Sequence, residues 1–182
     1  MAEKKYKMGV CSIAIATYLL VGVFAVHADT HWKIADEGFF ISMPTNWIKR
    51  TVHGIDSHVG AYKSDSTDLE FDGVVGLGYT IAKSQAKIDE LKKKEANPKL
   101  LSPDEEVWHI DGKICAFYFG KADTKVYGKR RFTNVAELFV PFAGEPAYLS
   151  VFIFYQSEKD LPTVRQVLKS IRWKKKDANK PK

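Results

Sequence analysis

One segment near the C-terminus, Tyr148–Tyr155, constrains the fold more than any other part of the sequence. If this segment is a β-strand, its side chains alternate between two faces. One face carries Leu149, Val151, Ile153 and Tyr155, and the other carries Tyr148, Ser150, Phe152 and Phe154. Apolar side chains on both faces are typical of a central strand with other elements packed on each side of the sheet.

Other runs are predicted as strands from their alternation and from the turns between them. The Asp111-Gly112 pair supplies the positive φ angles of a two-residue hairpin, so the runs beside it are expected to be antiparallel neighbours. The acidic segment Lys63–Gly73 is rich in turn formers and is expected to be a connection. The predicted strands are Phe39–Met43, His58–Lys63, Gly73–Ala82, Glu105–Ile110, Lys113–Phe119, Arg131–Phe142 and Ala147–Gln156.

Two helices complete the predicted elements. The segment Leu161–Ile171 has apolar residues at helical spacing, and Asp160 is a suitable N-cap residue. Arg165 and Lys169 are expected to face outward from this helix. An earlier and more weakly amphipathic helix is predicted over Ser84–Ala96.

The first predicted strand ends abruptly at a proline. Phe39, Ile41 and Met43 alternate inward, and Pro44 then stops the strand because it has no amide hydrogen for a sheet ladder. Trp47 is expected to fold back as an apolar plug at the edge of the core. Stacking of Trp47 on a ligand is the alternative.

The two ends of this region resemble a known family. The stretch Gly38–Trp47 is similar to the F-x-I-x-x-P-x-x-W opening of PsbP-like domains, and Leu161–Trp173 looks like their closing helix and S-[FI]-x-W tail. The family includes extrinsic proteins of photosystem II, small exported bacterial proteins such as DcrB, and the Ran-binding Mog proteins. The resemblance spans Trp32 to Trp173 and implies an α/β/α sandwich, which is an α+β fold with an antiparallel sheet covered by helices on both faces. It also implies binding or assembly of other proteins, with no shared catalytic residues.

The N-terminus is typical of a secretory signal peptide. Basic residues precede the apolar run Met8–Val26, and the small residue Ala28 is followed directly by Asp29. We therefore expect residues 1–28 to be removed, leaving one domain over 29–173 and a basic, disordered tail over 174–182, in a periplasmic or secreted protein. The alternative is a retained membrane anchor, because the apolar run is close to the roughly 20 residues that span a bilayer.

Removal of this segment would leave 154 residues with a net charge of +4. A chain of that length can bury a core of its own, and a monomer is expected. Cys115 would then be the single cysteine, so no internal disulfide is expected. Its apolar neighbours predict a buried, inert thiol.

Motifs that carry chemistry are sparse. The sequence has no G-x-S-x-G, H-E-x-x-H or Walker loop, and neither a catalytic residue nor a cofactor is expected. The candidate metal ligands are His53, Asp56 and His58, whose side chains a loop could bring together around Zn²⁺. The alternative is an ordinary polar loop. The carboxylates of Asp104–Glu106 are expected to be solvated.

Basic side chains cluster in two runs that are candidates for a membrane or partner surface. Either they only keep the protein in solution, or they attract anionic lipid headgroups weakly, by about 1 kcal/mol for each basic residue near the surface. Nucleic acid is not an expected partner of an exported protein. The candidate residues are Lys129, Arg130, Arg131, Arg172, Lys174, Lys175 and Lys176.

The sequence therefore favours a non-enzymatic, exported, PsbP-like binding or accessory module of the bacterial cell envelope. Its expected partner is an envelope protein whose identity the sequence does not give. The alternative function is a small metal-assisted hydrolase that uses His53, Asp56 and His58.

Overall fold

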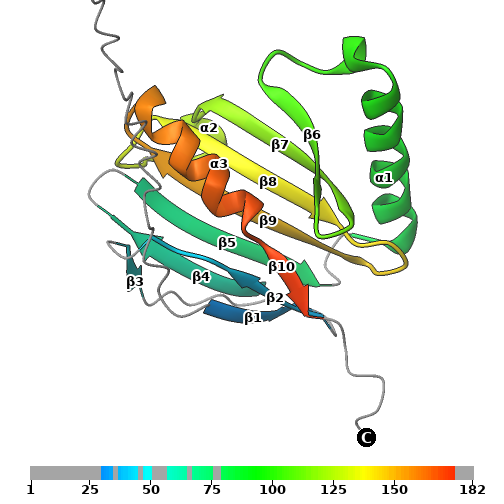
Figure 1. The fold of residues 1–182 in the computed structure, drawn as a ribbon, viewed down its shortest axis with the longest axis horizontal. Coiled ribbons are helices and arrows are strands. Elements are labelled where there is room, and N and C mark those ends of the chain that lie inside the picture. Colours follow the sequence, from blue (N-terminus) through cyan, green and yellow to red (C-terminus); the bar gives the residue numbers. More distant parts are fainter. Residues whose placement is uncertain are drawn as a thin grey trace, which may run out of the picture.

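A computed structural model of the 182-residue chain describes residues 30–34, 37–44, 47–50, 57–64, 67–75 and 79–174. These residues form antiparallel strands in two sheets, with helices packed against them (Figure 1). The strands are β1 (Thr30–Ile34), β2 (Glu37–Ile41), β3 (Ile48–Arg50), β4 (Ser57–Lys63), β5 (Thr67–Val75), β6 (Glu105–Ile110), β7 (Lys113–Lys121), β8 (Asn134–Pro141), β9 (Ala147–Tyr155) and β10 (Arg172–Lys174). The helices are α1 (Ile81–Ala96), α2 (Thr124–Tyr127) and α3 (Leu161–Lys169), with short 3-10 turns at η1 (Pro98–Leu100) and η2 (Glu158–Asp160).

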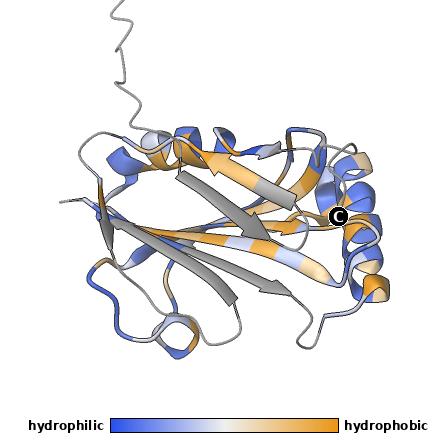
Figure 2. Cartoon of the chain, turned by 90° about the horizontal axis from the view of Figure 1, so that it is seen from below, coloured by the Kyte–Doolittle hydropathy of each residue, from blue (hydrophilic) through white to orange (hydrophobic). Residues whose placement is uncertain are grey.

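The larger sheet has seven strands in the order β3-β4-β5-β9-β8-β7-β6. The strand β9 lies between β5 and β8, so the prediction of an interior strand is confirmed. Leu149, Val151 and Ile153 are fully buried on one face of β9, and Phe154 is buried on the other. Hydrophobic residues follow the central strands, whereas much of the helical surface is hydrophilic (Figure 2).

One face of this sheet is covered by α3 together with the smaller sheet, β1-β2-β10. Val164, Val167 and Leu168 of α3 pack in one core cluster with the buried residues of β8 and β9. Phe39 and Ile41 of β2 belong to the same cluster, as do Met43 and Trp47. The predicted inward alternation and the predicted plug at Trp47 are therefore confirmed.

The helix α1 packs on the opposite side of β7. Its residues Ile88 and Leu91 contact Ile114 and Ala116, which alternate along β7 with the α3-facing Cys115. Strand alternation places these two sets on opposite faces. The predicted α+β class and antiparallel sheet are confirmed. A complete helical layer on each face is not, because strands as well as α3 cover one side.

The region before α1 differs from the prediction. Gly73–Ala82 was expected to be a strand and Lys63–Gly73 a connection, but β5 occupies Thr67–Val75 and pairs with both β4 and β9. Helix α1 begins at Ile81, earlier than predicted, because the Thr80 hydroxyl accepts a hydrogen bond from the amide of Lys83 at 3.2 Å.

The end of the chain also departs from the prediction in detail. The Asp160 carboxylate accepts from the amide of Ser157 at 2.9 Å and so caps the η2 turn instead of α3. Helix α3 ends at Lys169, and the residues after it form β10, which pairs with β2. Residues 175–182, most of the predicted tail, lie outside the described residues.

Replacing the plug residue by Trp47→Ala is expected to lower the free energy of unfolding by about 3–5 kcal/mol, since it empties a large buried volume. Trp47 is 6% exposed, whereas its neighbour Ile48 is 74% exposed. Ile48→Ala is the matched control and should change stability by less than about 0.5 kcal/mol. Urea unfolding of both variants measures the difference, and equal losses would contradict the plug role.

Candidate functional site

The strand β6 forms one end of the seven-stranded sheet, and in the described part of the chain it pairs only with β7 (Figure 1). The two strands meet at the Asp111-Gly112 turn, where φ is 48° and 80°, as predicted for a two-residue hairpin. At the far end of the hairpin, the amide of Phe119 donates to the carbonyl of Asp104 at 3.0 Å.

The hairpin register determines which backbone groups of β6 are free. Residues of an antiparallel pair alternate between those that exchange hydrogen bonds and those that do not. With Ile110 opposite Lys113 at the turn, Trp108 bonds to β7. The amide and carbonyl groups of Val107 and His109 therefore point away from β7, along the open edge.

A groove of about 640 Å³ runs beside this edge. Residues 107–111 line one side of it, and Lys169 and Arg172, at the end of α3 and the start of β10, line the other. The groove thus lies where the open edge of the large sheet meets the C-terminal end of α3.

The floor of the groove is fixed by Trp108, which is 8% exposed. Its ring stacks on Phe117 at 4.0 Å, and its Nε1–H donates to the Glu106 carboxylate at 2.8 Å. Arg165 donates to the same carboxylate from both terminal nitrogens, at 2.6 and 2.7 Å, and lies over the Phe117 ring at 4.7 Å. Hydrogen bonds from Arg165 hold the pKa of Glu106 below its usual value.

This cluster corrects two predictions. Arg165 was expected to face outward, and the carboxylates of Asp104–Glu106 were expected to be solvated; Asp104 is exposed as predicted, but Glu106 is held in an ion pair. Arg165 instead joins α3 to β6 through Glu106. The partners are 59 positions apart in the chain, so no local pattern could predict the pair.

The rim of the groove is more basic than acidic. Lys169 lies over the Trp108 ring at 4.7 Å, and Arg172 donates to the carbonyls of Lys169 and Ile171. Neither Lys169 nor Arg172 meets a carboxylate among the described residues at ion-pair distance. The carboxylate of Asp111, also in the lining, accepts from the amide of Trp173 at 2.6 Å.

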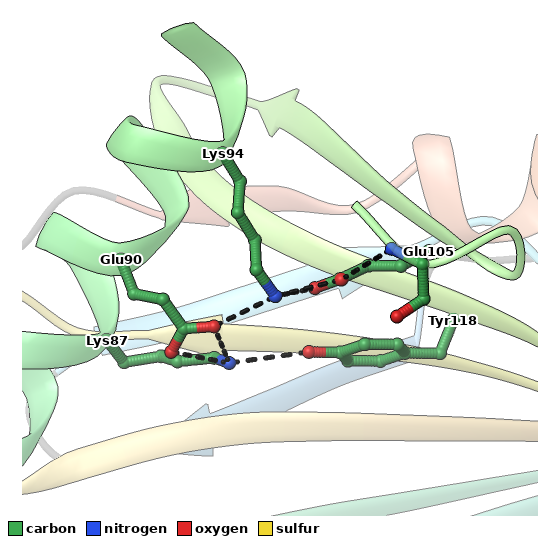
Figure 3. A network of polar contacts seen from close by, with 6 residues as sticks. Lys87, Glu90, Lys94, Glu105 and Tyr118 are labelled. Carbon is green, nitrogen blue, oxygen red and sulfur yellow. Dashed lines mark hydrogen bonds and ion pairs between the residues drawn. The ribbon is translucent and has the colours of Figure 1, made fainter. Parts of the chain in front are cut away.

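The second corrected carboxylate, Glu105, belongs to a network that fastens α1 to the sheet (Figure 3). Its side chain is 2% exposed, and its carboxylate forms an ion pair with the Lys94 ammonium at 2.7 Å. Lys94 also meets Glu90 at 2.9 Å, and Lys87 joins Glu90 to the Tyr118 hydroxyl. Burial lowers the pKa of Lys94, but the hydrogen bonds that Lys94 donates to Glu105 and Glu90 outweigh it, so this pKa lies above its usual value. These ion pairs and hydrogen bonds compensate the charge of Glu105, which is why this carboxylate can be buried.

A smaller pocket of about 230 Å³ lies between β7, β8 and α2, and Glu137 lines it. Burial raises the pKa of this carboxyl, which accepts from the Ser150 hydroxyl at 2.7 Å and from the Tyr127 hydroxyl at 3.4 Å. Burial, followed by the charge of Glu137, raises the pKa of Tyr127 to about 12. These three groups satisfy one another.

The predicted metal ligands are not brought together in the part of the chain that the structure describes. His53 and Asp56 lie outside the described residues, and His58 is described only as a backbone position of β4, opposite Gly73. Within the described ranges, no group of three or more His, Cys, Asp or Glu side chains is placed to hold a metal ion.

The two predicted basic runs have different surroundings. Arg130 pairs with Glu70 and lies over the Phe154 ring, and Arg131 lies over Phe132, while Lys129 is exposed. Arg172 lines the groove. Lys174 is described only as a backbone position of β10, and Lys175 and Lys176 lie outside the described residues.

No helix in the described part of the chain has both the length and the apolar character that a membrane span needs. The predicted signal peptide lies outside the described residues.

Comparison with known proteins gives no family. No protein family matches the sequence, and no curated protein does. A crystal structure from Bacteroides thetaiotaomicron, determined at 1.50 Å, is similar with a TM-score of 0.48 and 10% sequence identity. The match covers 79% of this chain and 47% of that one, so this chain spans about half the length of its neighbour.

The ion pair between Arg165 and Glu106 should make stability depend on acid. The pKa of Glu106 is lowered in the folded state from its ordinary value of 4.5, so its contribution is present above that value and is lost as the pH falls through the folded pKa. From about pH 5 to about pH 3, the wild type should lose roughly 0.5–1 kcal/mol more stability than Glu106→Gln. Urea unfolding across this range measures the difference, and parallel pH profiles would contradict the role of the pair.

Proposed function

We propose that the protein is a non-enzymatic, exported, PsbP-like binding or accessory module of the bacterial cell envelope, which binds an envelope protein or assists its assembly. The observation that carries the proposal is the groove beside β6. It is open, has an aromatic floor at Trp108, and is rimmed by Lys169 and Arg172. Aromatic residues and arginine are enriched at the centres of protein–protein interfaces.

Two ion pairs of the described residues have a structural role, which is in keeping with a non-enzymatic binding module. Glu106 and Arg165 join α3 to β6, and Glu105 and Lys94 join α1 to β6. Perturbed pKa values arise in structural ion pairs as well as in active sites, and these pairs connect elements of the fold.

The one cysteine in the described part of the chain adds to the same picture. Cys115 is fully buried, and burial raises the pKa of its thiol to about 12. The thiolate is the reactive form of cysteine, so this thiol stays protonated and unreactive near neutral pH. The predicted buried, inert thiol is confirmed.

The fold family, the oligomeric state and the cellular location of the protein are also part of the proposal. We place the chain among PsbP-like α/β/α sandwiches, as a monomer exported by a signal peptide that is cleaved after Ala28. Weak attraction of Lys129–Arg131 and of the C-terminal lysines to anionic headgroups would keep such a module near a membrane surface.

Binding of an envelope protein is tested by amine-reactive crosslinking of the tagged protein in its native cells. We expect one defined adduct, whose purified partner binds the purified protein again in solution. The control is an unrelated protein with the same tag, expressed and crosslinked in the same cells. If the tagged protein gives no adduct above this control, the binding function is wrong.

The competing hydrolase hypothesis is tested by elemental analysis of the purified protein. A binding module without a resident metal should carry zinc far below one ion per chain. Stoichiometric zinc that disappears in the double variant His53→Ala plus His58→Ala would instead favour the metal-assisted hydrolase. The matched control is His109→Ala, which removes an exposed histidine outside that loop and should leave the metal content unchanged.

Export is tested by the intact mass of the protein recovered from cells that express the full chain. Cleavage after Ala28 predicts a mature N-terminus at Asp29. A mass that retains residues 1–28 in the membrane fraction would show that the anchor is kept.

A further inference from the structure

The open edge of β6 lacks several of the devices that block such an edge. Edge strands are commonly protected by proline, by lysine, by bulges or by being very short. The sequence of β6 is EEVWHI, with neither proline nor lysine, and its register with β7 runs without a bulge from Glu105 to Ile110. At the opposite edge of the same sheet, three residues of β3 are described, and the residues that follow them, 51–56, lie outside the described part of the chain.

The acidic side chains of β6 are already neutralised within the fold. Lys94 meets Glu105, and Arg165 meets Glu106. The remaining four residues, Val107–Ile110, carry no carboxylate, and the free backbone groups of Val107 and His109 lie among them. The edge therefore offers two amides and two carbonyls to an incoming strand. The carboxylates nearest to these groups already have partners, because Glu95 pairs with His109 at 2.7 Å and Asp111 accepts from the amide of Trp173 at 2.6 Å.

The groove has space for such a strand, and its rim carries positive charges that an acidic side chain could pair with. A strand added to a sheet lies about 4.8 Å from its neighbour, and the 640 Å³ groove runs along residues 107–111. Lys169 and Arg172 are exposed on its far side, and among the described residues neither has a carboxylate at ion-pair distance, although Lys169 is near enough to Glu106 to help lower its pKa. A carboxylate on the added strand would supply an ion-pair partner.

We propose that the free edge of β6 binds an extended, acidic peptide segment of a partner protein, which adds to the seven-stranded sheet as one further strand. Its backbone pairs with the outward groups of Val107 and His109, and an Asp or Glu side chain reaches Lys169 and Arg172. This inference rests on the proposed binding function and names the binding mode and the class of partner.

The first test selects ligands from a displayed library of random eight-residue peptides with the purified protein. The selected peptides should be rich in Asp and Glu. Hydrogen exchange of the backbone amides, followed by NMR, then locates the binding. A synthetic selected peptide should slow exchange at Val107 and His109, while Trp108 and Ile110, whose amides already bond to β7, should change little.

A peptide control separates strand addition from any other contact. N-methylation of the alternate peptide amides that face β6 should abolish binding, and N-methylation of the amides on the other edge of the peptide should leave it unchanged. The protein is not altered in this comparison, so a folding defect cannot explain the result.

Protein variants test the charge. Lys169→Glu should weaken binding of the acidic peptide by about tenfold or more, equal to about 1.4 kcal/mol. Lys159→Glu changes the same charge at the other end of α3, in the η2 turn, and should leave affinity within about twofold at physiological salt. Lys169→Gln is the milder variant, should Lys169→Glu fail to fold.

The outcomes separate this inference from the proposed function. Protection of Val107 and His109 together with sensitivity to N-methylation supports strand addition. Peptides that bind but protect other amides overturn the β6 site while leaving a binding function standing. Protection that grows with protein concentration without peptide identifies a second copy as the occupant and also overturns it. If no peptide is selected above background, the inference is overturned, and the crosslinked partner decides the function separately.

Discussion

The contact between α3 and the sheet is the interaction on which the rest of the structure depends. Val164, Val167 and Leu168 are buried against β8 and β9, and each such side chain contributes about 1.5–3 kcal/mol by leaving water. The same contact sets the position of the helix end, from which Lys169 and Arg172 reach the edge of β6. The groove is therefore a consequence of core packing, although its rim is polar.

Polar contacts then hold α3 and β6 in the positions that core packing gives them. Arg165 holds Glu106 with two hydrogen bonds, and Glu106 orients the indole of Trp108 with a third. Because the guanidinium also lies over aromatic rings, its charge is shared between a carboxylate and π faces. On the other side of β6, Lys94 and Glu105 attach α1. An edge strand held from both faces is a stiff template, and a stiff template loses little entropy when a second strand pairs with it.

Much of the sheet could be predicted from local sequence patterns. The predictions that were wrong have a common cause. The alternation of β9 and the Asp111-Gly112 turn gave the interior strand and the β6–β7 hairpin correctly. The segment that forms β5 was instead predicted to be a connection, because it contains acidic residues such as Asp68 and Glu70. That segment is a strand because β4 and β9 pair with it on both sides, and this pairing is decided by parts of the chain far away in sequence. The groove was beyond prediction for the same reason, because its two sides come from residues about 60 positions apart.

The β6 edge of the large sheet presents six residues in regular register, and in the described part of the chain no further strand pairs with them. A long unprotected edge exposes a protein to unwanted pairing, so folds that retain one must limit what can add to it. Here a basic rim beside the edge restricts the choice, because a neutral or basic strand would gain no partner for Lys169 and Arg172 and a basic one would be repelled. Edge and rim together discriminate among strands, which the backbone of β6 alone could not do.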